Sequence, residues 1–179
     1  MTNIVYIATS LDGYISAPDG NLDWLSMVPN PDDDDLGFAA FMSRVDVVVM
    51  GRVTFESVVG FDVGWPYPVP GLILSRSLSQ IPAGFEDKVQ IISGTPEQII
   101  AQAGGMGHET LYIDGGKTIQ GFLRADKIDE MILSELPVLL GGGDRLFGGL
   151  VARLEFEHIG VEVLLGQITK RHYVRRRDK

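Results

Sequence analysis

The sequence predicts an α/β protein in which helices cover both faces of a central sheet, and three observations predict it. Short apolar runs recur along the chain, and several are continuous rather than alternating, as in Asp46–Met50. Continuous runs rich in β-branched residues are typical of strands buried on both faces, which favours a parallel or mixed sheet. Helical patterns separate these runs up to about residue 125, and the pattern is β-rich afterwards.

Seven apolar runs are too short for helices and are predicted as strands: Ile4–Ala8, Val47–Met50, Leu72–Leu74, Val89–Ile92, Leu111–Ile113, Met131–Leu133 and Val138–Leu140. Further on, Val161–Leu165 and Ile168–Val174 alternate in polarity around Gly166 and Gln167. This second pattern predicts a closing antiparallel pair.

Three helices are predicted between the strands. The first has one apolar stripe at helical spacing, made of Phe38, Phe41, Met42 and Val45. The second begins with a capping box at Thr95–Gln98, with proline at its first helical position, and ends at Gly104 and Gly105. The third follows Gly116 and has a short inner stripe, made of Ile119, Phe122 and Leu123.

Composition excludes several classes of function. The 179 residues suit a single domain, residues 1–179, and the excess of 24 acidic over 15 basic residues gives a net charge of −9. Such a charge repels phosphate backbones and anionic lipid, so no nucleic-acid or membrane partner is expected. The lack of cysteine excludes disulfides and thiolate zinc sites, and the three histidines show no metal-ligand spacing, so no metal is predicted. With no signal peptide and no apolar run of roughly 20 residues, the expected location is cytoplasmic.

Two strand ends share a pattern that is suited to phosphate binding. At Met50–Thr54 and again at Ile113–Thr118, a buried strand ends in glycine and a helical pattern begins. A helix N-terminus offers free N–H groups and a partial positive charge, and glycine lets a phosphate approach closely. Both ends would lie at the carboxyl edge of the sheet, where open α/β folds bind ligands.

A third strand end, Leu74–Ser77, places a hydroxyl beside a guanidinium, a pair that suits a terminal phosphate. Together the three sites fit NADP rather than NAD. The structural alternative is that the glycines only make turns and the arginine pairs with a surface carboxylate. Gly116–Thr118 lacks the earlier glycine of a phosphate-binding loop, because Leu111 stands there, and no Gly-x-Ser-x-Gly elbow occurs. Kinase and hydrolase functions therefore lose support.

Two acidic residues are candidates for catalysis. The loop Ser10–Gly20 contains two Asp-Gly pairs and a proline, which indicate either ordinary turns or a mobile lid over a reactive site. Asp12 of this loop could orient a substrate or relay a proton. The run Asp32–Asp35 is typical of a solvated helix N-terminus, but Asp35 lies on the side of the apolar stripe. We therefore expect a partly buried carboxylate that faces a cleft and could supply a proton to a heterocycle.

The sequence resembles the dihydrofolate reductase-like superfamily, and more closely the reductase family named for the C-terminal domain of the bifunctional riboflavin-biosynthesis deaminase/reductase. The matching segments run in order along nearly the whole chain: Ser10–Ile15, Val49–Glu56, Trp65–Pro68, Leu74–Ser77, Ile113–Lys117 and Pro137–Gly143. The pattern Met-Gly-Arg-x-Thr-Phe-Glu at residues 50–56 is the most specific of them.

The resemblance implies a three-layer α/β/α sandwich with a central mixed, mostly parallel sheet of about eight strands, and NADPH as hydride donor. It implies that the cofactor phosphates are held by Gly51, Arg52, Thr54, Gly115, Gly116, Lys117 and Thr118, and the 2′-phosphate by Ser75 and Arg76. In dihydrofolate reductases a catalytic acid precedes the glycine of Met-Gly-Arg by sixteen residues, which matches Asp35 here. A homodimer is also expected, from the resemblance and from the apolar last third of the chain.

The resulting hypothesis is an NADPH-dependent reductase of a pyrimidine- or pterin-like heterocycle. It is similar to the reductase that acts on 5-amino-6-(5-phosphoribosylamino)uracil in riboflavin biosynthesis. The alternatives are a true dihydrofolate reductase, a non-catalytic NADP-binding module, and a fold that has lost its cofactor. The chain has no deaminase domain or zinc motif, so it is not the whole bifunctional enzyme.

Overall fold

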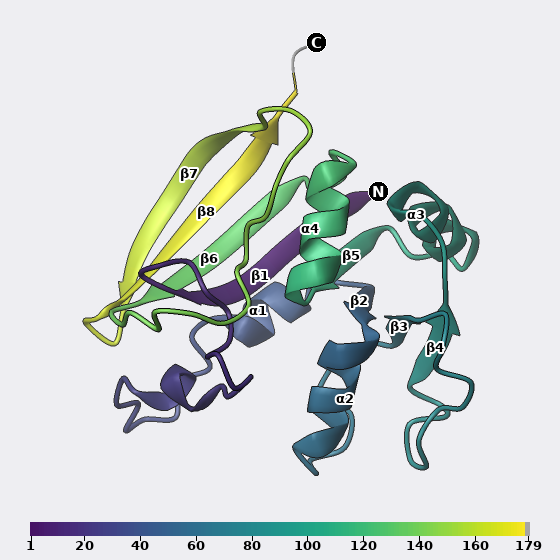
Figure 1. Cartoon of the computed structure of the whole chain (residues 1–179), viewed down its shortest axis with the longest axis horizontal. Helices are drawn as coiled ribbons and strands as arrows, with labels where there is room; N and C mark the ends of the chain where they lie inside the picture. The colour runs from purple at the N-terminus through teal and green to yellow at the C-terminus, as the bar shows by residue number, and fades with distance from the viewer. Residues whose placement is uncertain (178–179) are drawn as a thin grey trace.

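The computed structural model of the chain describes residues 1–177. Within them, eight strands form one sheet in the order β4-β3-β2-β5-β1-β6-β8-β7 (Figure 1). The strands are β1 (Thr2–Ser10), β2 (Val47–Gly51), β3 (Gly71–Leu74), β4 (Val89–Ile92), β5 (Thr110–Asp114), β6 (Glu130–Leu136), β7 (Glu155–Leu164) and β8 (Ile168–Arg176). The six strands from β4 to β6 in this order are mutually parallel, whereas β8 runs antiparallel to β6 and β7 antiparallel to β8.

Helices cover both faces of the sheet, as the sequence predicts. They are the short 3-10 helix η1 (Asp23–Ser26) and the helices α1 (Phe38–Met42), α2 (Arg52–Gly60), α3 (Pro96–Gly105) and α4 (Gly116–Arg124). Helices α3 and α4 pack on one face, and α1 and α2 pack on the other. Figure 1 shows α4 in front of the sheet and α1 behind it. The predicted three-layer α/β/α sandwich, with a central mixed and mostly parallel sheet of eight strands, is confirmed for the described residues.

Strand β2 shows why its run of apolar residues is continuous. Val47 and Val49 face the α3/α4 layer, whereas Val48 and Met50 face the α1/α2 layer, and all four are fully buried. Side chains alternate between the faces of a strand, so a strand covered on both faces needs an apolar residue at every position. Burying each of these side chains stabilises the fold by about 1.5–3 kcal/mol.

The predicted helix start at Thr95 is confirmed in detail. The backbone N–H of Gln98 donates to the Thr95 hydroxyl at 3.4 Å, and the Thr95 N–H donates to the Gln98 side chain at 2.9 Å. This reciprocal pair satisfies two N–H groups that have no partner inside the helix. The predicted antiparallel pair is also confirmed, because β7 and β8 form a hairpin around Gly166.

Two predictions about the elements are wrong. Val138–Leu140 is not a strand, because its backbone bonds to the loop after β1 instead of to a neighbouring strand: the Leu11 N–H donates to the Val138 carbonyl at 2.8 Å, and the Leu140 N–H donates to Asp12. The first helix ends at Met42 rather than continuing to Val45. Val45 is nevertheless buried in the same apolar cluster, which explains its position in the stripe.

None of the helices in residues 1–177 is both long enough and apolar enough to span a lipid bilayer.

Candidate functional site

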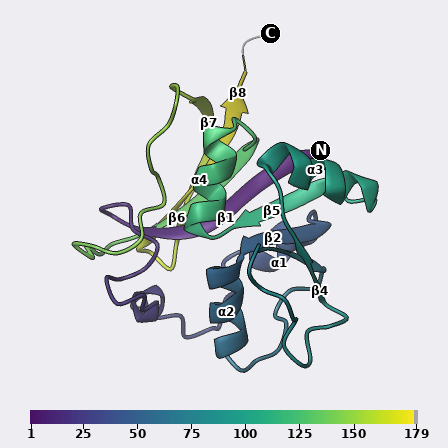
Figure 2. The same cartoon turned by 45° about the vertical axis from the view of Figure 1, so that its right-hand side comes forward.

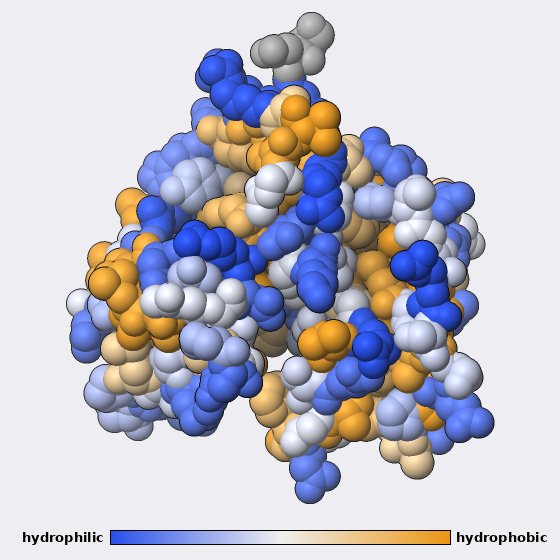
Figure 3. Space-filling view, in the orientation of Figure 1, coloured by the Kyte–Doolittle hydropathy of each residue, from blue (hydrophilic) through white to orange (hydrophobic). Residues whose placement is uncertain are grey.

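A cavity of about 800 Å³ opens at the edge of the sheet where the parallel strands end. Strands β2 and β5 lie side by side, and each leads directly into a helix, α2 after β2 and α4 after β5. The N-termini of both helices therefore reach the cavity, and Figure 2 shows them meeting where the two strands end. Figure 3 shows the surface hollowed between α2 and the segment that carries η1.

The N-termini of α2 and α4 lie against each other, and the glycine that precedes each helix packs against a threonine of the other helix. A Cβ atom placed on Gly51 would lie 3.1 Å from the Thr118 hydroxyl, and one placed on Gly115 would collide with the Thr54 hydroxyl. Gly115 also has a φ of +86°, which L side chains rarely adopt. The result is a bare backbone cradle between two positive helix ends, which suits a diphosphate.

The structure brings most of the predicted cofactor residues together. Seven of them line the cavity: Gly51, Arg52, Thr54, Gly115, Gly116, Lys117 and Thr118. The predicted pair at the end of β3 lies just outside the lining. Leu74 borders the cavity, Arg76 is exposed two residues later, and the Ser75 hydroxyl accepts hydrogen bonds from the backbone N–H groups of Ser77 and Leu78. Their role toward a 2′-phosphate stays a prediction.

Asp12 joins two loops and does not line the cavity. Its carboxylate accepts hydrogen bonds from the Ser10 hydroxyl at 2.6 Å and from the N–H groups of Leu140 and Gly141 at 3.1 and 2.8 Å. These bonds, the one from Ser10 above all, lower the pKa of Asp12 to about 2. A carboxylate held in this way connects the loop after β1 to residues 137–146, and it is poorly placed to relay a proton.

These two loops together form one wall of the cavity. The Ile15 N–H donates to the Asp144 carbonyl at 2.8 Å, and the guanidinium of Arg145 stacks 4.6 Å from the centre of the Tyr14 ring. Ile15 and Arg145 line the cavity, and a Cβ on Gly116 would lie 2.8 Å from Ile15. The loop predicted as a lid therefore packs against the helix cradle.

The expectation that Asp35 is a partly buried carboxylate facing the cleft is wrong. The residue is exposed, and its carboxylate accepts hydrogen bonds from the backbone N–H groups of Ala39 and Gly37, both at 2.8 Å. These two bonds, Ala39 first, lower the pKa of Asp35. Asp35 thus caps the first turn of α1, which is the role that the acidic run predicts. A catalytic role for it stays an untested prediction.

Asp114 is the cavity carboxyl that sequence reasoning missed. It is the last residue of β5, it is half-buried, and it lines the cavity beside Gly115. Burial raises its pKa to about 6, although the N–H of Gly115 donates to it at 2.8 Å and the hydroxyls of Tyr112 and Tyr67 also favour its charged form. The sequence signal that could have identified Asp114 as a site residue is an acidic residue at the end of an otherwise apolar strand, immediately before the pair Gly115 and Gly116.

Tyr67 closes the cavity beside Asp114. It lies in the loop after α2, and its ring packs against Trp65 and Tyr112 at centroid distances of 4.8 and 6.3 Å. Burial first, and then the charge of Asp114, raise the pKa of its hydroxyl above the ordinary range. Tyr67 therefore keeps its proton and can donate a hydrogen bond inside the cavity.

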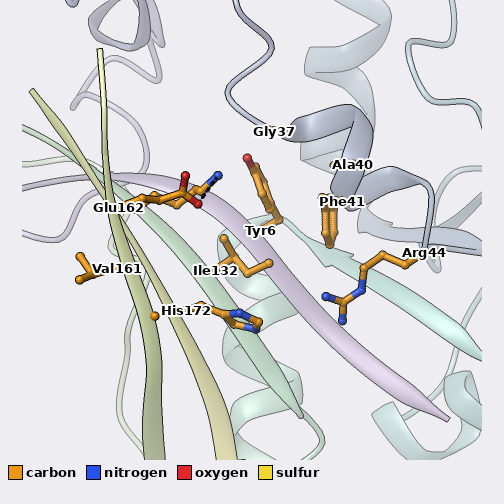
Figure 4. Close-up of a pocket in the computed structure, with 11 residues that line it drawn as sticks. Tyr6, Gly37, Ala40, Phe41, Arg44, Ile132, Val161, Glu162 and His172 are labelled. Carbon is orange, nitrogen blue, oxygen red and sulfur yellow. Dashed lines mark ion pairs between the residues drawn. The ribbon is translucent and has the colours of Figure 1, made fainter. Parts of the chain in front are cut away.

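A second cavity of about 390 Å³ lies on the face covered by α1 (Figure 4). Tyr6, Phe41 and Ile132 line it, and Arg44 and His172 at its rim share Glu130, at 2.7 and 3.0 Å. None of the predicted cofactor residues borders it. The described part of the chain, residues 1–177, contains no group of three acidic or histidine side chains able to hold a metal ion.

Taken together, these observations define a protein with a dihydrofolate reductase-like sandwich fold and a large cavity at the edge where its parallel strands end. The chain belongs to the RibD C-terminal domain family, whose model matches residues 74–169. It is 32% identical over 174 residues to the uncharacterized protein YwjB of Bacillus subtilis, covering 96% of this chain and 97% of that protein. It also resembles a crystal structure from Shewanella sp. PV-4 described as "Putative riboflavin biosynthesis protein", with 51% identity, a TM-score of 0.96, and coverage of 99% and 100% of the two chains.

Two more distant structures share the fold. One is a diaminohydroxyphosphoribosylaminopyrimidine deaminase/5-amino-6-(5-phosphoribosylamino)uracil reductase from Thermotoga maritima, with 18% identity and a TM-score of 0.74. The match covers 98% of this chain but 56% of that one, so this chain spans about half its length. The other is a dihydrofolate reductase from Enterococcus faecalis complexed with NADP(H), with 19% identity, a TM-score of 0.69, and coverage of 98% and 97%. The family supports a reductase-like function for this chain.

Proposed function

We propose that the chain is an NADPH-dependent reductase that transfers a hydride to a pyrimidine- or pterin-like heterocycle. The observation that carries this proposal is the meeting of two helix N-termini in one large cavity, at a cradle that only glycine leaves open. Family membership supports the reductase class, and the Enterococcus structure with NADP(H) bound to the same fold supports the choice of cofactor.

The residues of the cradle fit NADPH. The N–H groups at the start of α2 and α4, with the Thr54 and Thr118 hydroxyls, would hold the diphosphate, and Arg52 and Lys117 would balance its charge. Gly94 and Pro96 border the same cavity where β4 leads into α3, and Leu74 at the end of β3 borders it as well. A nucleoside that lies there would bring its 2′-phosphate toward Arg76.

Bound NADPH supplies the hydride, and the protein positions the acceptor and manages the proton. Asp114 and Tyr67 converge beside the cradle, where a heterocycle can hydrogen-bond to both. With a pKa of about 6, Asp114 still carries its proton in roughly one molecule in ten at neutral pH, which allows it to protonate a ring nitrogen. With both ligands bound, the wall that contains Ile15 would limit the access of water to the reacting atoms.

Calorimetry with NADPH and NADH tests the cofactor. We expect the wild type to bind NADPH more tightly than NADH, because the 2′-phosphate meets Arg76. Arg76→Ala should weaken NADPH binding by roughly ten- to a hundredfold, as expected for a lost charged hydrogen bond, and leave NADH binding unchanged. Arg153→Ala is the matched control, because that exposed arginine pairs with Glu155 and does not line the cavity.

Two results would contradict the cofactor part of the proposal. Equal losses for both dinucleotides would remove the assignment of Arg76, and a wild type that binds neither would remove the cofactor.

The substrate is tested by following NADPH oxidation against aminopyrimidines, dihydropterin and dihydrofolate. Turnover of dihydrofolate with inhibition by an antifolate would favour a dihydrofolate reductase, whereas NADPH binding without oxidation of any acceptor would favour a non-catalytic module.

A further inference from the structure

Tyr112 is a buried tyrosine that stands beside the cavity carboxyl without bordering the cavity. It precedes Asp114 by two positions on β5, so both side chains point to the face that α1 and α2 cover. Tyr112 is 5% exposed and is not part of the cavity lining, whereas Asp114 and Tyr67 are. A role of Tyr112 toward a bound ligand is therefore indirect.

The ring of Tyr112 is held by its neighbours, and its hydroxyl has two acceptors. The ring packs edge-on against Phe41 at a centroid distance of 5.0 Å and lies 6.3 Å from the ring of Tyr67. The hydroxyl donates to the backbone carbonyl of Tyr6 at 2.9 Å. The same hydroxyl and the Asp114 carboxyl are also hydrogen-bond partners. A phenol has one proton to donate and an oxygen that can accept, so Tyr112 gives a full hydrogen bond to only one of these acceptors at a time.

The protonation state of Asp114 decides which acceptor is better. An ionised carboxylate is a stronger acceptor than a backbone carbonyl, so it attracts the proton of the Tyr112 hydroxyl. A protonated carboxyl is itself a donor, so it can donate to the Tyr112 oxygen while the Tyr112 proton stays on the Tyr6 carbonyl. The two arrangements differ only by a rotation of the hydroxyl about its C–O bond, so the packed ring does not have to move.

The other partners of the Asp114 carboxyl are the Gly115 N–H, at 2.8 Å, and the Tyr67 hydroxyl. Burial raises the pKa of both Tyr67 and Tyr112 above the ordinary range, so the two tyrosines act as neutral hydrogen-bonding groups. Burial first, and then these hydrogen bonds, set the pKa of Asp114. The charged residues that border the same cavity belong to the starts of α2 and α4 and to the loop wall: Arg52, Lys117, Asp144 and Arg145.

We propose that Tyr112 is a positioning residue for the reaction: its hydroxyl turns from the Tyr6 carbonyl to the Asp114 carboxylate when Asp114 gives its proton to the acceptor. In that step the carboxyl O–H bond breaks and an N–H bond forms on the acceptor ring, where the proton balances the negative charge that the hydride brings. Asp114 then takes a new proton from solvent, and the hydroxyl turns back. The catalytic part of this inference rests on the proposed function, whereas the exchange of hydrogen bonds is a property of the folded chain.

Carbon NMR of the wild type without ligands tests the exchange. The carboxyl resonance of Asp114, identified by its loss in Asp114→Asn, reports the protonation state, and the ring Cζ resonance of Tyr112 reports the partner of its hydroxyl. We expect the two resonances to change together around pH 6. The Cζ resonance of Tyr6 should not follow them, because the Tyr6 hydroxyl donates to the Leu36 carbonyl at 3.1 Å and points toward Gly37 (Figure 4). A Tyr112 resonance that does not follow Asp114 overturns the inference.

Tyr112→Phe removes the hydroxyl and keeps the ring, so the variant is expected to fold. The pKa of Asp114 should rise by about 1, because a hydrogen bond to a charged group is stronger than one between neutral groups. The decline in turnover with pH should move up by about one pH unit, with the KM for the acceptor unchanged. Tyr6→Phe is the matched control, since it removes a hydroxyl from the same aromatic cluster but leaves the partners of Asp114 in place.

An unchanged pKa of Asp114 in Tyr112→Phe overturns the inference, and so does an equal rise in Tyr6→Phe. Lower turnover at every pH with the same midpoint would give Tyr112 a structural role alone and overturns it as well. Titration of NADP⁺ into the wild type reports separately on the proposed function. If NADP⁺ does not bind, the proposed function fails, while the titration of Asp114 still decides whether the hydroxyl of Tyr112 changes its partner.

Discussion

Three aspartates show how the surroundings of a carboxyl set its chemistry. Asp12 accepts hydrogen bonds first from the Ser10 hydroxyl and then from backbone N–H groups, whereas Asp35 accepts them from backbone N–H groups. These bonds hold the pKa values of both carboxyls below the ordinary range. Asp114 receives similar bonds but is enclosed by protein, so burial dominates and its pKa rises to about 6. The residue type is the same in each case, and of these three carboxyls only that of Asp114 is poised to exchange a proton near neutral pH.

Replacing Asp114 should stabilise the protein and slow the reaction. Its pKa is higher in the folded chain than in the unfolded chain, so folding binds a proton and stability falls as pH rises from about 4 to about 6. At pH 8, Asp114→Asn should raise the free energy of unfolding by about 2 kcal/mol. This gain is smaller than the full difference between the folded and unfolded pKa of Asp114 implies, because the cavity admits solvent. The gain in stability should vanish at pH 3, where Asp114 is protonated in both the folded and the unfolded chain.

Denaturant unfolding at the two pH values measures this effect, with Asp19→Asn as the control on an exposed loop. In wild-type turnover we expect a decline as pH rises above about 6, because the protonated fraction of Asp114 falls. An Asp114→Asn variant that gains no stability at pH 8, or that keeps full turnover, would contradict the assignment.

Asp12 should act on the cavity through the loops that it joins. Asp12→Asn replaces one carboxylate oxygen with an amide that cannot accept from the backbone, so either Leu140 or Gly141 loses its bond. We expect faster amide hydrogen exchange in residues 138–146 and several-fold weaker NADPH binding, since the wall with Ile15 loosens. Asp19→Asn again serves as control, because the exposed Asp19 accepts a hydrogen bond from the N–H of Asn21 within its own turn. Unchanged exchange in residues 138–146 would show that Asp12 is not needed to join the loops.

At the scale of elements, the cradle depends on how α2 and α4 begin. Each helix follows a parallel strand and starts at a glycine without a side-chain cap, which leaves its first N–H groups free for a ligand. In contrast, α3 has both a threonine cap and a capping box. The helices that border the cradle are thus uncapped, whereas α3 begins with a capped first turn.

Gly115→Ala should disable the cradle. The φ of +86° costs about 1–3 kcal/mol for a residue with a side chain, and the new methyl group would collide with Thr54. We expect lower stability and at least tenfold weaker NADPH binding, measured by thermal unfolding and calorimetry. Gly121→Ala is the matched control inside α4, where a Cβ meets nothing within 4 Å, and it should be neutral or stabilise by about 0.5–1 kcal/mol. Equal behaviour of the two variants would contradict a special role for Gly115.

At the scale of the whole molecule, one edge of the sheet is left open. Strand β7 pairs on one side only, and its Ile159, Val161 and Val163 are 51–64% exposed. Long edge strands with apolar side chains are prone to pair with another chain. We therefore retain the prediction of a homodimer and assign its contact to β7.

Light scattering during size exclusion tests the dimer. The wild type should elute at twice the chain mass, and the double variant Val161→Lys with Val163→Lys should elute as a monomer with retained NADPH binding. Met106→Lys, an exposed apolar site at the end of α3, should leave the dimer intact. A monomeric wild type would remove the prediction.

Local signals were sufficient for most of the fold. The buried strands and the start of α3 follow from side-chain alternation and capping, both of which involve residues within a few positions of one another. Val138–Leu140 was predicted wrongly because its backbone partners lie about 128 residues away, at Leu11 and Asp12. Its apolar composition resembles that of a strand, but a loop supplies its hydrogen bonds.

The sequence alone determined the strand–glycine–helix junctions at Gly51 and Gly115, because the signals that end a strand and start a helix lie within a few neighbouring residues. Only the tertiary structure decided that these two junctions meet, since β2 and β5 are neighbours in the sheet although Gly51 and Gly115 are 64 positions apart in the chain. The same holds for the carboxyls. Burial, which sets the pKa of Asp114 apart from those of Asp12 and Asp35, comes from distant segments packed around the group and has no local signature.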